Sequence, residues 1–403
     1  IMAHVARVLP NEKTLRLHYS NCKCYNADFD GDEMNAHFPQ NELARAEAYQ
    51  IANVNHQYLV PKDGSPLSGL IQDHIVAGAL LTIRGRFLTK GDYQELLYSS
   101  LSFLNAYIKT LPPAIIKPKK LWSGKQIISS IILNIVPKGK IPPTFSISSK
   151  VSPKLFQSNK PKKYTAGGTP LQENEMSESE VIFRQGELMT GIIDKANLGS
   201  QQYGLIHLCY ELYGGDSSAA LFTSFARLCT HYLQLHHGFT LGIEDILVND
   251  KANNKRHKYI ARSNKLGEQA ACEAMGITDD EDKLLLQDKL QSAHTNKSDI
   301  YMKLLDKSMK QQTDEINNNI TEACLPKGLV KKFPDNNMQL MIQAGAKGGS
   351  VNAIQISCLL GQIELEGRRP PLMMSGKSLP SFKMYDTSPR AGGFVSGRFM
   401  TGK

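Results

Sequence analysis

The sequence predicts an α+β protein built from several domains, and three observations support this fold class. The chain has 403 residues, enough for two or three domains of roughly 150 residues each. Apolar and polar residues alternate at 14–19 and 181–199, as in half-buried strands, whereas residues 41–55, 216–237 and 251–320 have helical composition or spacing. A hydrophobic content of 41% and a charged content of 21% are typical of a globular protein with a sizeable core.

Composition narrows the classes of function. The net charge of +9 favours an anionic partner such as nucleic acid, a nucleotide or a membrane surface, although lysine-rich loops alone also produce it. The seven cysteines are scattered and form no CxxC pair, which predicts free thiols in a reducing compartment and no zinc site. Because no run of about 18 apolar residues occurs, no membrane-spanning segment and no membrane partner are expected.

The first half of the chain predicts several elements in order. Asn41 is placed to cap the helix at 41–55, and the Pro- and Gly-containing stretch 61–70 predicts a loop. A helical pattern follows from Leu70, and the apolar stretch 124–136 indicates a buried helix or a core strand. Residues 138–170 carry seven lysines and no acidic residue, which predicts a flexible basic insert or surface loop.

In the second half, the alternation at 181–199 turns at Gln185-Gly186, which suggests a β-turn. Residues 238–248 predict a turn followed by a strand or short helix. Leucine and methionine stripes within the charged stretch 251–320 predict a helical hairpin with solvated outer faces. The stretch 338–367 predicts a helix, a Gly-rich break and a second helix.

The most informative stretch is "YNADFDGDEMN", in which Asp28, Asp30 and Asp32 stand at every second position. On an extended segment, side chains two residues apart point to one side. Gly31 can adopt backbone angles closed to other residues, so that the loop can curl around one point. Three carboxylates that converge in this way suit Mg²⁺, which proteins hold with a few oxygen ligands, water and substrate phosphates.

The cluster has three alternative interpretations. An EF-hand that starts at Asp28 needs Gly at position 6 and Glu at position 12, but the chain has Glu33 and Pro39 there. A Mg²⁺-dependent phosphohydrolase of the D-x-D type needs an apolar strand before the first aspartate, and the polar "NCKCYNA" stands there instead. A solvated acidic turn is the third alternative.

The segment "YNADFDGDEMNAHFPQ" resembles the active-centre signature of the largest subunit of multisubunit DNA-directed RNA polymerases, whose core is NADFDGD. The resemblance spans essentially the whole chain. Its flanking sequences are most similar to those of the eukaryotic polymerase I class, which makes ribosomal RNA, while polymerases II and III share the NADFDGD core. The other segments that resemble this subunit are, in order, "GLIQDH" (69–74), "LWSGKQ" (121–126), "GLIHLCYELYGG" (204–215), "GFTLGIEDILV" (238–248), "GAKGGSVNAIQ" (345–355), "GQIELEGRRPPL" (361–372) and "SPRAGGFVSGRF" (388–399).

The resemblance implies a role for each site residue. Asp28, Asp30 and Asp32 would hold the catalytic Mg²⁺, a second Mg²⁺ arrives with the nucleotide, and Gly31 would support the metal loop. Asn26 would lie near the sugar 2′-hydroxyl and help to select ribonucleotides, or would brace the loop through an Asx-type turn. Lys347, among glycines in "GAKGGS", would approach the incoming triphosphate.

The resemblance also implies a domain layout. The expected parts are the second part of a double-psi β-barrel with the metal loop (1–60), a mixed pore region containing the basic insert 138–170 (61–250), a helical funnel hairpin (251–325), and a pore and helical segment leading toward a bridge helix (326–403). Arg368 and Arg369 are expected to form salt bridges.

The implied function is DNA-templated RNA synthesis in the nucleus and nucleolus. Its expected partners are the second-largest polymerase subunit and other subunits, the DNA template, the RNA product, ribonucleoside triphosphates, and a cleavage factor or subunit that enters the funnel. A fragment of this kind is expected to be inactive alone, because the second barrel and the bridge helix lie elsewhere. The alternative from another class is a non-catalytic scaffold that keeps the fold but contributes no chemistry.

Overall fold

The computed structural model describes residues 2–159, 178–277, 283–295 and 299–399, and they fold into two compact units. Unit 1 comprises Ile1–Thr240 with Leu340–Lys347, and unit 2 comprises Leu241–Gln339 with Gly348–Lys403. Helices and small antiparallel sheets occur together, in agreement with the predicted mixed α+β class. No described helix has both the length and the apolar character needed to span a membrane.

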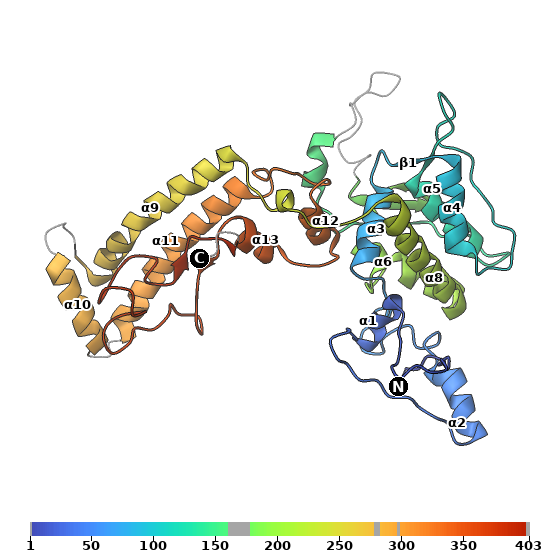
Figure 1. Ribbon diagram of the computed structural model, residues 1–403, viewed down its shortest axis with the longest axis horizontal. Coiled ribbons are helices and arrows are strands. Elements are labelled where there is room, and N and C mark those ends of the chain that lie inside the picture. The colour runs from blue at the N-terminus through green and yellow to red at the C-terminus, as the bar shows by residue number, and fades with distance from the viewer. Residues whose placement is uncertain (1, 160–177, 278–282, 296–298, 400–403) are drawn as a thin grey trace. The chain divides into compact units, whose positions relative to one another are not determined.

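Unit 1 is organised around a helical core, in which α3, α4, α5 and α8 pack together (Figure 1). The predicted apolar stretch at 124–136 is a helix, α5, which begins with a capping box between Ser123 and Gln126. Ile127 and Ile131 lie on its fully buried face. The elements of unit 1 are η1 (Tyr19–Asn21), α1 (Cys22–Tyr25), α2 (Glu42–Glu47), η2 (Ala48–Ala52), α3 (Asp73–Thr82), β1 (Phe87–Leu88), α4 (Lys90–Leu101), β2 (Trp122–Ser123), α5 (Gly124–Ile135), β3 (Phe145–Ser148), η3 (Pro153–Asn159), β4 (Glu180–Arg184), β5 (Glu187–Thr190), α6 (Lys195–Leu198), α7 (Leu205–Tyr213), α8 (Gly215–His231) and η4 (Tyr232–His236).

The alternation at 181–199 forms the predicted hairpin of β4 and β5. Its turn residues Gln185 and Gly186 have φ of 49° and 82°, the left-handed pair that a tight two-residue hairpin turn requires. β3 pairs with β4 and completes a three-stranded sheet. Part of the basic insert is therefore sheet and not loop, while residues 160–170 lie outside the described residues.

The first sixty residues depart most from the prediction. The expected strand at 14–19 is wrong, because residues 14–18 have no regular structure and Leu15 is 63% exposed. Between residues 2 and 60 the described backbone has isolated bridges, such as Ala3 with Asn53, and no longer strand. A strand forms only against a neighbouring strand, and no other described segment pairs with residues 14–19.

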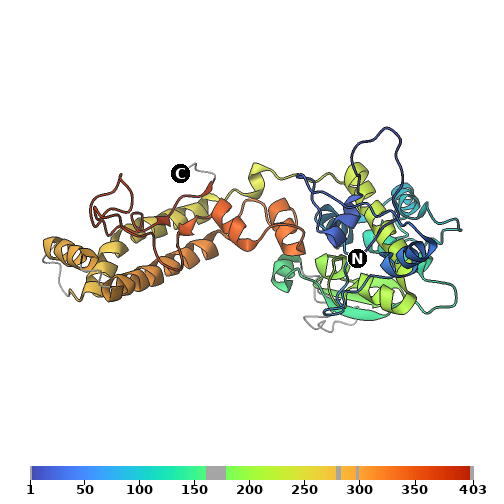
Figure 2. The same cartoon turned by 90° about the horizontal axis from the view of Figure 1, so that it is seen from below.

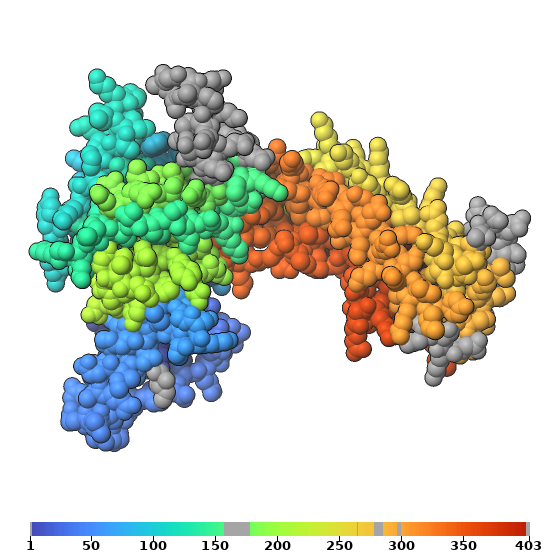
Figure 3. All heavy atoms as spheres, turned by 180° about the vertical axis from the view of Figure 1, so that it is seen from behind, coloured from blue at the N-terminus to red at the C-terminus, as the bar shows by residue number. Residues whose placement is uncertain are grey.

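The N-terminal segment joins the rest of unit 1 through a few specific contacts. Tyr58 is buried and stacks on Tyr210, with ring centroids 5.2 Å apart. Asn55 donates a hydrogen bond to Asp216 at the start of α8. In the space-filling view this segment, coloured blue, adjoins the yellow-green surface of unit 1 (Figure 3). The predicted helix at 41–55 is α2 continued by the π-turn η2, and Asn41 caps it through Ala44 N.

Unit 2 is dominated by the predicted helical hairpin. α9 and α11 run side by side, and α10 packs between them at the far end of the hairpin (Figures 1 and 2). α9 is capped by Asn249 and ends at Gly276, whose φ of 64° suits a helix C-terminus. The elements of unit 2, with α12 ending in unit 1, are η5 (Ile243–Asp245), α9 (Asp250–Met275), α10 (Lys283–Thr295), α11 (Asp299–Cys324), α12 (Asn337–Ala344), α13 (Ser350–Ser357), β6 (Gly361–Gln362) and β7 (Phe394–Val395).

Two apolar clusters hold unit 2 together. One joins α9, α10 and α11 through residues such as Ala271, Leu290 and Met309. The other lies at the opposite part of α11, where Ile320 packs with Cys358 and Leu359 after α13. All seven cysteines are free thiols, as predicted.

Candidate metal centre

The structure brings the three predicted aspartates together. One carboxylate oxygen from each of Asp28, Asp30 and Asp32 lies within 4.8 Å of the other two. All three side chains are exposed, so that solvent and a substrate can reach them. Oxygen ligands from three carboxylates with open positions match the way proteins hold Mg²⁺ together with water and phosphate oxygens.

Local backbone geometry produces this convergence. Asp28 N donates a hydrogen bond to Asp32 Oδ2 at 3.1 Å, and Asp30 N donates to Asp28 Oδ1 at 3.5 Å. Gly31 has a φ of 127°, a backbone conformation that residues other than glycine rarely adopt. No atom lies within 4 Å of the position that a Cβ would occupy. Gly31 therefore lets the loop fold back on itself, as the sequence predicted.

The electrostatics of the loop are unfavourable without a cation. The pKa of Asp30 is raised, first by its hydrogen bond with Asp28 and then by the negative charge of that neighbour. A raised pKa means that the third negative charge is resisted, and a divalent cation would relieve that repulsion. The donor set and the charge thus fit a hard divalent cation.

Asn26 lies at the end of the short helix α1, two residues before the first aspartate. It has the left-handed φ of 48°, and Ala27 N donates to Cys22 O at 3.1 Å in the manner of a helix C-cap. The backbone of Asn26 therefore turns the chain from α1 into the acidic loop. Its side chain is exposed and is available for a substrate.

Lys347 is exposed in the turn after α12 and forms no ion pair with the aspartates among the described residues. Two further cations, Lys150 and Lys195, lie beside this turn and were not predicted from the sequence. A Cβ at Gly345 would lie 3.0 Å from Lys150 Nζ and 3.2 Å from Lys195 Cβ. Burial lowers the pKa of Lys195, and the neighbouring charges of Lys150 and Lys23 lower it further. Their basic character was visible in the sequence, but the approach of three distant segments was not.

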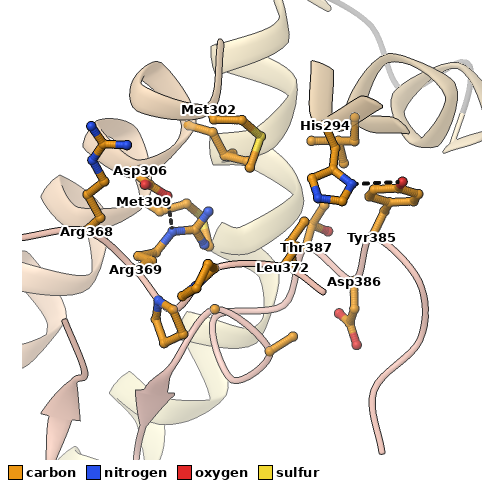
Figure 4. Close-up of a pocket in the computed structure, with 16 residues that line it drawn as sticks. His294, Met302, Asp306, Met309, Arg368, Arg369, Leu372, Tyr385, Asp386 and Thr387 are labelled. Carbon is orange, nitrogen blue, oxygen red and sulfur yellow. Dashed lines mark hydrogen bonds and ion pairs between the residues drawn. The ribbon is translucent and has the colours of Figure 1, made fainter. Parts of the chain in front are cut away.

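Unit 2 contains a pocket of about 280 Å³ between α10, α11 and the segment 368–392 (Figure 4). Arg369 lies at its wall and forms the expected salt bridge, with Nε 2.8 Å from Asp306 Oδ1. Arg368 also lines the pocket. On the other side, His294 and Tyr385 hydrogen-bond through Nδ1 and the phenol oxygen, 3.3 Å apart. This pocket contains no part of the acidic loop.

Comparison with known proteins identifies the family of the chain. Residues 1–54, 57–246 and 283–395 match the family models "RNA polymerase Rpb1, domain 2", "domain 3" and "domain 4" in that order. The aspartates lie in the first of these matches. This chain belongs to the family of largest subunits of DNA-directed RNA polymerases.

Its relatives include subunits of more than one polymerase class. The chain is 54% identical over 402 residues to DNA-directed RNA polymerase I subunit RPA1 of Drosophila melanogaster, and 45% identical over 412 residues to subunit RPA190 of Saccharomyces cerevisiae. It is 32% identical over 405 residues to DNA-directed RNA polymerase III subunit rpc1 of Dictyostelium discoideum. Each match covers the whole chain but only 23–25% of the relative, so that the chain spans about a quarter of these subunits.

Proposed function

We propose that this chain supplies the catalytic metal loop for DNA-templated RNA synthesis, as a segment of the largest subunit of RNA polymerase I. The observation that carries the proposal is the convergence of the three carboxylates within 4.8 Å, in a segment that matches Rpb1 domain 2. The reaction is nucleotidyl transfer from a ribonucleoside triphosphate to the 3′ end of the RNA.

The roles follow from the ligand chemistry of the loop. Asp28, Asp30 and Asp32 would hold one Mg²⁺, and Gly31 keeps their oxygens together. When bound, this ion and a second one carried by the nucleotide would activate the RNA 3′-hydroxyl and stabilise charge at the α-phosphate. Because the three aspartates are exposed, the remaining coordination positions are open to water and phosphate oxygens.

Two residues would orient the nucleotide. The exposed Asn26 side chain would hydrogen-bond the 2′-hydroxyl, with its backbone fixed by the helix cap. Lys347 would attract the triphosphate, and the proximity of Lys150 and Lys195 to Gly345 supports a positive potential at that turn. Substrate recognition would thus combine one polar contact at the sugar with a broader attraction for phosphate.

The remainder of the site would come from partners. The second-largest subunit would complete the nucleotide site, and the first sixty residues would form their double-psi barrel only with chain beyond this segment. Residues 61–250 would line the pore, with a basic insert at 138–170. The hairpin at 251–325 would be the funnel, where a cleavage factor or subunit enters, and 326–403 would lead toward the bridge helix. The segment alone would be inactive.

Polymerase I is favoured over class III by the identities of 54% and 45% with two polymerase I subunits against 32% with the polymerase III subunit. The nucleus and nucleolus are the sites where such an enzyme would act. A non-catalytic scaffold would have no need for three mutually repelling carboxylates, and their retention favours catalysis.

The test is made in the assembled polymerase that carries the full-length subunit. Replacing Asp28, Asp30 and Asp32 together by Asn should lower promoter-independent RNA extension by at least about 10³-fold, since a catalytic metal contributes several kcal/mol to the barrier. Glu33→Gln is the matched control. Glu33 is also exposed and adjoins the motif, but it does not belong to the three carboxylates that lie within 4.8 Å of one another. Extension at the control's rate by the triple variant would refute the assignment.

A further inference from the structure

We propose that Glu95, His231 and His236 form a second metal site in unit 1, one that takes Zn²⁺ or a similar imidazole-binding transition metal. The three residues come from different elements: α4 contributes Glu95, the last residue of α8 is His231, and the π-turn η4 ends at His236. One ligand atom from each lies within 4.8 Å of the other two.

The distances suit a tetrahedral ion. Two ligand atoms bound to one Zn²⁺ at 2.0–2.2 Å lie roughly 3.3–3.6 Å apart in tetrahedral geometry. His231 Nε2 lies 3.3 Å from Glu95 Oε1, which falls within this range. His236 Nε2 lies 3.9 Å from Glu95 Oε2, so that a small rotation of the carboxylate would complete the set. Both histidines therefore lie within reach of the same carboxylate.

Apart from the long contact with Glu95, the ligand nitrogen of His236 has no polar partner among the described residues. His236 Nε2 is buried and has no hydrogen-bond partner in the structure. A buried nitrogen without a partner costs free energy, which a metal bond would recover. The π-turn is the reason for its position, since the widened turn brings a residue five positions after His231 back to the same carboxylate.

Neighbouring aromatic rings hold the histidine in place. Tyr232 is buried and stacks against His236, with ring centroids 6.3 Å apart. The nearby cation Arg86 contacts His237 instead, and Arg86 Nη2 lies 3.4 Å from His237 Nε2. His237 does not belong to the proposed metal site. Glu95 is half exposed, which leaves the fourth coordination position open to water. Three protein ligands and one open position are typical of an accessible zinc site.

The ligand types select the metal. Two imidazoles and one carboxylate favour Zn²⁺ over Mg²⁺, because Mg²⁺ prefers oxygen ligands alone. The sequence predicted no zinc site because its cysteines are scattered. Cysteine spacing carries no information about a site built from two histidines and a carboxylate. A bound ion would join α4 to the end of α8 and so stabilise the packing of these helices.

The test uses the 403-residue chain after removal of metals with a chelator. We expect one equivalent of Co²⁺ to give the visible absorption of a tetrahedral site and Zn²⁺ to abolish it. Glu95→Gln and His236→Gln should each weaken Co²⁺ binding at least about 10-fold. At about 100 times its dissociation constant, Zn²⁺ should raise the unfolding midpoint of the wild-type chain by roughly 5 °C, and not that of the variants.

His207→Gln is the matched control. His207 Nε2 lies 3.4 Å from Glu211 Oε1, nearly the same as the 3.3 Å between His231 and Glu95. Among the described residues this pair belongs to neither group of three side chains that could hold a metal ion. The control should bind Co²⁺ like the wild type. The proposal is overturned if the wild type gives no tetrahedral absorption, if the spectrum shows thiolate ligands, if both ligand variants retain the site, or if His207→Gln loses it equally.

Discussion

The aspartate triad and the Glu95–His231–His236 triad are two groups of similar size with opposite origins. Both bring three ligand atoms within 4.8 Å of one another. The aspartates lie within five residues of one exposed loop, whereas the other group joins residues 141 positions apart in sequence, from Glu95 to His236. The first depends on local backbone geometry and the second on the packing of helices.

Charge separates the two groups further. Asp28 raises the pKa of the neighbouring Asp30, so that a bound cation would stabilise the charged form of the aspartate loop. One carboxylate with two imidazoles carries far less repulsion. An exposed loop can keep this unbalanced charge if a cation completes it, whereas a site that joins two helices has to form within the packing of the fold.

Disturbing the helical core should produce the largest difference in metal binding between the two sites. A Cβ at Gly124 would lie 1.9 Å from Leu81 O, so that Gly124→Ala must push α5 away from α3. Overpacking of this kind is expected to lower the free energy of unfolding by about 3 kcal/mol. Urea unfolding followed by the fluorescence of Trp122, the single tryptophan, measures it.

The control for this change is Gly91→Ala at the start of α4, where the nearest atom to a new Cβ is 3.8 Å away. It should leave stability unchanged or raise it slightly. In the Gly124→Ala chain, Zn²⁺ binding at the helical triad should weaken while Mn²⁺ binding at the aspartate loop is retained. Equal loss at both sites would show that the loop depends on the core after all.

Acid should also destabilise the helical core. Burial lowers the pKa of His74 in α3 from its ordinary value of 6.5 to about 4, with a further contribution from His18. Between these values the unfolded chain binds a proton that the folded chain refuses, so stability falls as pH decreases from 6.5 to 4. The loss is about 3 kcal/mol.

Comparison with His74→Gln isolates this effect. The variant should lack the His74 part of the pH dependence, which is obtained as the difference between the two unfolding curves at each pH. Asp194 contributes in the opposite sense in both proteins, because burial raises its pKa to about 6. Identical slopes for wild type and variant between pH 6.5 and 4 would contradict the assignment.

The contrast between the triads explains how far the sequence could be read. The convergence of Asp28, Asp30 and Asp32 around Gly31 could be predicted because residue spacing and backbone freedom are local properties. The helices with strong caps and apolar faces, such as α5 and the hairpin of unit 2, were predicted for the same reason. The prediction of a strand at 14–19 was wrong because alternating apolar and polar residues indicate which face of a segment would be buried. They do not indicate whether a partner strand is present.

Long-range sites gave no such signal. Glu95, His231 and His236 are unremarkable residues until α4 and α8 pack and the π-turn forms. The proximity of Lys150 and Lys195 to Gly345 likewise depends on three separate segments. The roles of Asn26 and Lys347 rest on the resemblance to the polymerase family, since the structure fixes their backbone positions and shows no substrate.

Gly31→Ala should weaken the aspartate site alone. With φ at 127°, an alanine is strained by about 1–2 kcal/mol even though its Cβ meets no atom, and the loop is expected to relax away from the convergent geometry. Mn²⁺ affinity, measured by relaxation broadening near Asn26, should fall about 5- to 30-fold. Gly64→Ala, at a φ of 68° and also without neighbours, is the matched control and should leave Mn²⁺ affinity unchanged.

Asn26 is the residue at which local structure and proposed function coincide, and two substitutions separate them. Glycine accepts the φ of 48° without strain, whereas alanine at this cap costs about 1 kcal/mol. If the side chain contacts the sugar, Asn26→Gly and Asn26→Ala in the assembled polymerase should both lower the preference for ribonucleotides over deoxyribonucleotides about 10-fold, the value of one hydrogen bond. If Asn26 only shapes the loop, the glycine variant will keep the wild-type preference and the alanine variant alone will lose extension rate. The ratio of the two incorporation rates, measured for each variant, decides between a residue that reads the substrate and one that only holds the metal loop in place.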